Sequence, residues 1–149
     1  MQSFKPWFPV ERIPERLHEV FVLHHSVEAV TLLCHGDFEN EKLLLIRFDT
    51  FQAVAIHDEF AHKWPGESDA IALPKSPNSS WTFPFLQVEN SVWGANSEYA
   101  LTYGHVPGHF CVLSDSSIVD VLSLKSPVIN WITADKAKLV LQAMESGAA

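Results

Sequence analysis

The chain has 149 residues, 47% of them hydrophobic, and its formal net charge at pH 7 is −8. A chain of this length can bury a core of its own, and this composition excludes an intrinsically disordered protein. Only ten lysines and arginines are present, and they are scattered. The charge therefore excludes a nucleic-acid-binding domain, which needs a basic face against the phosphates. We predict one globular domain over residues 1–149.

The N-terminal part of the sequence has the pattern of neither a secretory signal nor a membrane span. Residues 1–9 have no continuous apolar run, and polar residues interrupt the longest mainly apolar stretch, residues 20–34. We therefore expect a cytoplasmic protein without a membrane partner. Cys34 and Cys111 lie in or beside apolar strand-like runs, which predicts two reduced, buried thiols.

The first elements are predicted from prolines and apolar spacing. Three prolines in residues 1–14 fix φ and remove amide donors, so this segment is expected to be an extended arm anchored by Phe4, Trp7 and Phe8. For residues 14–25 two structures remain open. Pro14 suits the start of a helix with one apolar face, whereas residues 20–23 also fit a strand, and of the two the helix is favoured.

Further along the chain the pattern predicts mainly strands. Apolar runs indicate strands over residues 28–34, 43–48 and 51–56, the first two as a hairpin, and a fourth over 81–88 with Pro84 at an edge or bulge. Residues 109–113 and 118–122 form the clearest second hairpin, predicted to be central.

The last predicted element is a helix. Thr133 is expected to cap it, with apolar residues at 137, 140, 141 and 144 and an end at Gly147. Together these elements predict an α+β fold. Its sheet is curved and mainly antiparallel, with about five to seven strands, a C-terminal helix and, from residues 14–25, an N-terminal helix.

Known catalytic motifs do not fit this sequence. The zincin motif needs two histidines four apart with Glu directly after the first, but His57 and His62 are five apart with Asp58 between. The serine nucleophile elbow and the phosphate-binding loop are both missing. Cys34 and His35 are adjacent in a predicted strand, so their side chains should face opposite sides and cannot form a thiol–base pair. We predict no catalytic residues, no cofactor and no metal.

The histidines and cysteines support only a rival function. His109 and Cys111 are two apart and share one side of a predicted strand, but a zinc site with Cys34 and His35 would need a bulge. The favoured interpretation is buried thiols and surface histidines. Acidic residues are also interpreted as surface positions: Asp58, Glu59, Glu67, Asp69, Asp115 and Asp120. The rival is a small metal-binding protein or enzyme that uses His57, His62, His105, His109 or Cys111.

The irregular middle of the chain is rich in tryptophan, with Trp64, Trp81 and Trp93 in or beside it. Exposed loop aromatics anchor protein interfaces. With the acidic charge, they predict a non-enzymatic domain that binds a basic partner protein through a surface formed by Glu59, Trp64, Glu67, Asp69 and Trp93. A further alternative is a structural subunit whose apolar loops form an oligomer; the sequence does not fix an oligomeric state.

Several strings in the sequence also follow a familiar order. They are residues 43–49, residues 88–91, His109 with Phe110, and residues 118–123 before Pro127. This order resembles small bacterial uncharacterised domains, some of which are similar to immunity proteins of polymorphic toxin systems. The resemblance covers about the middle two-thirds of the chain and rests on strands and turns. It implies an immunity-like inhibitor and transfers no catalytic residue.

Overall fold

The computed structural model describes residues 2–24, 26–27, 29–58, 73–76 and 82–145, and structural statements below refer to these. They contain nine strands and three helices. In chain order these are β1 (Ser3–Pro6), β2 (Leu17–His24), β3 (Val30–Gly36), β4 (Leu43–Phe48), β5 (Phe51–His57), β6 (Phe85–Glu89), α1 (Val92–Ala95), α2 (Glu98–Tyr103), β7 (Gly108–Leu113), β8 (Ile118–Ser123), β9 (Val128–Ile132) and α3 (Ala134–Glu145).

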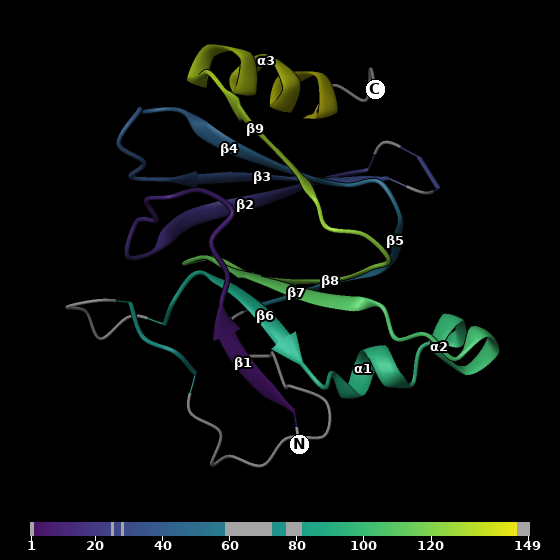
Figure 1. The fold of residues 1–149 in the computed structure, drawn as a ribbon. Coiled ribbons are helices and arrows are strands. Elements are labelled where there is room, and N and C mark those ends of the chain that lie inside the picture. Colours follow the sequence, from purple (N-terminus) through teal and green to yellow (C-terminus); the bar gives the residue numbers. More distant parts are fainter. Residues whose placement is uncertain (1, 25, 28, 59–72, 77–81, 146–149) are drawn as a thin grey trace.

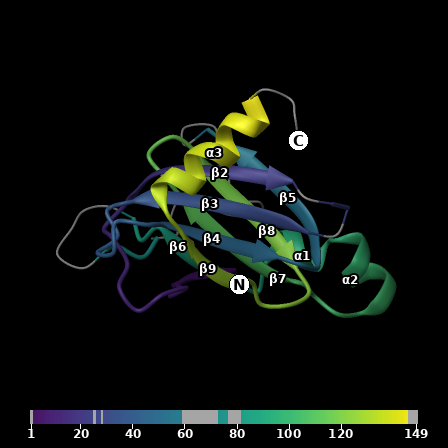
Figure 2. The ribbon, with the colours of Figure 1, turned by 90° about the horizontal axis from the view of Figure 1, so that it is seen from above.

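The strands form two antiparallel sheets that lie face to face (Figure 1). Sheet A has the strand order β1-β6-β7-β8-β5, and sheet B has the order β2-β3-β4-β9. Helix α3 crosses the outer face of sheet B, as the view from above shows (Figure 2). Helices α1 and α2 lie at one end of the sandwich, in the connection from β6 to β7.

The main core fills the space between the sheets. Alternate residues of sheet B point into it, among them Leu32, Leu44 and Ile46, all fully buried. Their neighbours along the strands point the other way, where Leu33 and Leu43 form a second small core with Ala137 of α3. Because both faces of sheet B are covered, its strands have continuous apolar runs rather than an alternation of apolar and polar residues.

Much of the predicted arrangement is confirmed. The sheets are mainly antiparallel, the chain has a C-terminal helix, β3 pairs with β4, and β7 pairs with β8 in the middle of sheet A. The hydroxyl of Thr133 accepts a hydrogen bond from the amide of Lys136 at 3.3 Å and caps α3 as expected. The predicted end at Gly147 lies outside the described residues.

The predicted N-terminal helix is wrong, because most of residues 14–25 form β2, which pairs with β3 from Leu17 to His24. Val20 and Val22 pack against the core between the sheets, whereas Phe21 and Leu23 pack under α3. A strand that is apolar on both faces has apolar residues at successive positions, and some of these also match the spacing of one helix face. For this reason the apolar pattern of residues 14–25 favours a helix.

The predicted single curved sheet of five to seven strands is also wrong, since the described residues hold nine strands in two sheets. The prediction missed β1 and β9. Pro84 precedes β6, and β6 is an interior strand rather than an edge because the N-terminal segment pairs with it as β1. Phe4 and Trp7 of this segment pack against the main core, whereas Phe8 is exposed.

Candidate functional site

The first candidate is a buried chain of polar side chains from three elements. Ser91 Oγ lies 2.7 Å from His109 Nδ1, and His109 Nε2 lies 2.7 Å from Asp120 Oδ1. Ser91 caps α1, His109 belongs to β7 and Asp120 to β8. Phe110 contacts Phe48 of sheet B, so by strand alternation His109 points to the outer face of sheet A.

Serine, histidine and aspartate in this order resemble the groups of a serine hydrolase, but the surroundings here give them another role. Ser91, His109 and Asp120 are only 3%, 2% and 4% exposed, so a substrate cannot reach them. Ser91 Oγ also accepts the amide hydrogen of Gly94 at 2.9 Å as the helix cap. We assign these three residues to a structural network that fixes α1 against sheet A.

The proton positions in this network follow from the partners. Because Ser91 Oγ accepts from Gly94, its own hydrogen is free to be donated to His109 Nδ1, and His109 Nε2–H then donates to the Asp120 carboxylate. The edge of Trp93 packs against the imidazole with ring centroids 5.3 Å apart. The predicted surface positions of His109 and Asp120 are therefore wrong: both are buried, and hydrogen bonds within the network satisfy both ring nitrogens of His109 and one carboxylate oxygen of Asp120.

Both cysteines are free and fully buried, as predicted. Burial raises the pKa of Cys34 and of Cys111 well above the usual range, and the adjacent Asp120 carboxylate raises the pKa of Cys111 further. A thiol that stays protonated is a poor nucleophile and a poor metal ligand. In the described part of the chain, no three His, Cys, Asp or Glu residues come together as a metal site.

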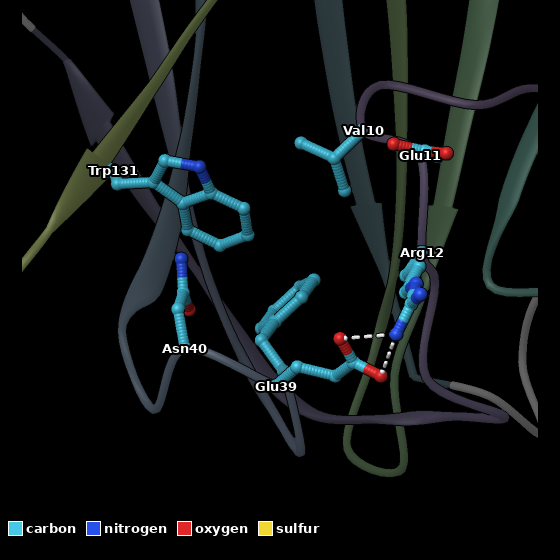
Figure 3. A pocket seen from close by; sticks show the side chains of 7 residues that line it. Val10, Glu11, Arg12, Glu39, Asn40 and Trp131 are labelled. Carbon is cyan, nitrogen blue, oxygen red and sulfur yellow. Dashed lines mark hydrogen bonds and ion pairs between the residues drawn. The ribbon is translucent and has the colours of Figure 1, made fainter.

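The second candidate is an open pocket of about 610 Å³ at one side of the sandwich (Figure 3). It lies between the segment that follows β1 and the edge strand β9, with the β3–β4 turn at its base. Its lining combines two aromatic rings with four polar or charged side chains and one valine: Val10, Glu11, Arg12, Phe38, Glu39, Asn40 and Trp131.

Trp131 reaches this pocket because of its place in the sheet. It pairs with Leu44, which points into the main core, so the indole lies on the same inner face. Since β9 is the last strand of sheet B, the ring projects at the open side and stays 39% exposed. Its edge packs on Phe38 at a centroid distance of 5.2 Å, and Phe38 itself is buried in the core. Trp131 is thus an exposed aromatic ring on a rigid base.

The turn that carries Phe38 is held by hydrogen bonds between its own residues. Asn40 Oδ1 accepts the amide hydrogen of Lys42 at 3.0 Å, and Glu41 adopts a left-handed conformation with φ of 58°. The Glu41 amide donates to the Phe38 carbonyl at 3.0 Å. These bonds fix the turn residues that line the pocket, including Glu39 and Asn40.

The charges of the described residues that line the pocket sum to one negative charge. Arg12 Nη1 lies 2.6 and 2.8 Å from the two carboxylate oxygens of Glu39, an exposed ion pair that closes one side (Figure 3). Glu11 has no ion-pair or hydrogen-bond partner among the residues that the structure describes. The pocket therefore offers one unneutralised carboxylate on one wall and an exposed indole on the other, a combination that suits a cation.

Of the predicted binding residues the structure describes only Trp93, which does not line this pocket. Glu59, Trp64, Glu67 and Asp69 lie outside the described residues, as does His62. Trp93 is half-buried against His109. Of the rival's other residues, His57 ends β5 and His105 is exposed before β7. Sequence reasoning missed Trp131, although the apolar run of residues 128–132 after Pro127 was a usable signal for a strand.

No helix within the described ranges combines the length and the apolar character needed to cross a membrane. A scan against protein-family models, a search of curated proteins and a search of solved structures each found no match to the chain.

Proposed function

We propose that this protein is a non-enzymatic binding domain for a basic partner protein, and that the pocket beside Trp131 is its contact site. The observation that carries the proposal is the exposed indole of Trp131, which packs on Phe38 and shares its pocket with the unneutralised carboxylate of Glu11 on the opposite wall. Rigid aromatic residues in a partly enclosed site are the usual anchors of protein interfaces. A lysine or arginine side chain would contact both the ring and the carboxylate.

The overall charge supports the same class of partner. With a formal charge of −8, the chain attracts a basic protein at long range and repels acidic ones. An inhibitor of the immunity type, which the order of the sequence strings resembles, would use such a site to cover the active cleft of a basic partner. The buried Ser91–His109–Asp120 network does not favour an enzyme, because its polar atoms already bond to one another away from solvent.

A selection from displayed random peptides tests the proposal. The immobilised domain is expected to enrich peptides that contain lysine and arginine, and their binding should weaken as salt rises. Trp131→Ala should weaken the selected peptides by about tenfold or more, as expected for an interface anchor, whereas Trp131→Phe should keep part of the affinity. Glu11→Gln should weaken them by about two- to fivefold.

Tyr103→Ala is the matched control, because Tyr103 is another aromatic residue that is largely exposed, on α2 away from the pocket. This variant should bind like the wild type. Circular dichroism verifies that each variant is folded. A selection without basic peptides, or selected peptides that bind Trp131→Ala and wild type equally, would refute the proposal.

A further inference from the structure

The two sheets have four edge strands: β1 and β5 in sheet A, and β2 and β9 in sheet B. Edge strands carry unpaired backbone groups, and proteins usually protect them with charged residues, proline or a bulge. β1 contains Lys5 and Pro6. β2 contains Glu19 and a register shift beside it, and β5 has a shift between Phe51 and Ala53. Three of the four edges therefore carry such a feature.

β9 is different. Its sequence, Val-Ile-Asn-Trp-Ile, contains no charged residue and no proline, and its five residues pair with β4 in unbroken register from Arg47↔Val128 to Leu43↔Ile132. Val128, Asn130 and Trp131 are exposed. Among the described strands, none pairs with the other side of β9. It is thus a regular, uncharged edge that can accept a further strand.

The pocket lies where alternate side chains of such a strand would point. Ile129 and Trp131 face the inner side of sheet B, since Ile129 packs against the main core and Trp131 pairs with Leu44. A strand added beside β9 would direct every second side chain to this same side, beside Trp131 and toward the pocket that Glu11 also lines. The other side chains would point to the α3 side of the sheet.

We propose that β9 binds an extended segment of the basic partner as an additional antiparallel strand of sheet B, with a lysine or arginine side chain of that segment lying against Trp131. The inference rests on the proposed function and adds the mode of binding to it. Main-chain hydrogen bonds to β9 supply affinity, and the cation in the pocket supplies specificity. The antiparallel direction continues the pattern of every pair in sheet B.

A second copy of this chain is a less favourable occupant of the same edge. Symmetric pairing of two β9 strands would bring two pockets of negative charge together, between molecules that each carry a charge of −8. A basic segment instead neutralises Glu11. Charge therefore favours a peptide of the partner over self-association.

The test uses a blocked peptide of about seven residues in which lysine and valine alternate, long enough to cover β9. Two further versions carry N-methyl groups on alternate amides: one on the odd-numbered amides and the other on the even-numbered amides. A strand added to an edge uses only one of the two sets of amides. One methylated peptide should therefore bind at least about tenfold more weakly than the unmodified peptide, and the other within about threefold of it. Trp131→Ala should weaken the unmodified peptide.

Amide hydrogen exchange gives a second readout. The peptide should slow exchange in β9 and leave the other edge strand on this side, β1, unchanged. If both methylated peptides bind as well as the unmodified one, strand addition is refuted while the proposed function stands. Failure of the unmodified peptide to bind at about 1 mM also overturns the inference. So does a concentration-dependent dimer that Trp131→Ala dissociates, since a second copy would then occupy the edge.

Discussion

His109 links two buried partners, so its replacement by phenylalanine tests the structural role of the network. Phenylalanine replaces the imidazole by a somewhat larger aromatic ring that can keep the contact with Trp93, but it removes both hydrogen bonds. The Asp120 carboxylate then loses a bond of about 1.5–3 kcal/mol, and leaving the Ser91 hydroxyl without its acceptor costs about 1–3 kcal/mol. We expect the free energy of unfolding to fall by about 3–5 kcal/mol.

Urea unfolding followed by circular dichroism measures this loss. With a slope of about 2 kcal/mol per molar urea, the midpoint should fall by about 2 M. Asp120→Asn added to the His109→Phe variant should recover part of the stability, because it removes a buried charge that has lost its hydrogen bond to His109. A loss below about 1 kcal/mol, or effects of the two substitutions that simply add, would contradict the assignment of a coupled buried network.

Two further predictions concern stability. Burial raises the pKa of Cys34 and Cys111, so the folded chain retains thiol protons that the unfolded chain loses above about pH 8.5. Above that pH the free energy of unfolding should fall by up to about 2.7 kcal/mol per pH unit, and below it these two thiols should have no effect. Urea titrations at pH 7.5 and 10 should show this fall reduced in a variant with both cysteines replaced by alanine, and an equal fall would contradict it. Gly104→Ala should lower the free energy of unfolding by about 1 kcal/mol, because Gly104 follows α2 with φ of 71°, a conformation that alanine rarely adopts. A Cβ at this position meets no atom, so only backbone strain contributes, and an unchanged midpoint in urea would refute this reasoning.

The sequence predicted the elements whose signals are local. The β7–β8 hairpin has dense apolar arms around a serine-rich turn, in which the Ser114 hydroxyl donates to the backbone carbonyl of Ser117 and accepts the Ser117 amide hydrogen. Thr133, whose hydroxyl caps α3, is a local signal of the same kind. Such signals need only neighbours along the chain, so they can be interpreted without knowledge of the fold.

What could not be predicted depends on distant contacts. His109 is a buried residue only because Ser91 and Asp120 meet it across three elements. β9 is short and becomes a strand by pairing with β4, more than 80 residues earlier in the chain. For the same reason Trp131 was not recognised: its exposure results from the position of β9 at the edge of a sheet.

The sequence distance between paired strands predicts the order in which they form during folding. β2, β3 and β4 follow one another as a meander, so most of sheet B closes through short loops. In sheet A both outer strands pair with segments that are distant in the sequence. Ser3 of β1 lies opposite Glu89, and His57 of β5 lies opposite Ile118. Because closing a longer loop costs more entropy, these pairings and the equally distant pairing of β9 with β4 should form last during refolding, and the four-residue edge strand β1 should detach early when the native state opens locally.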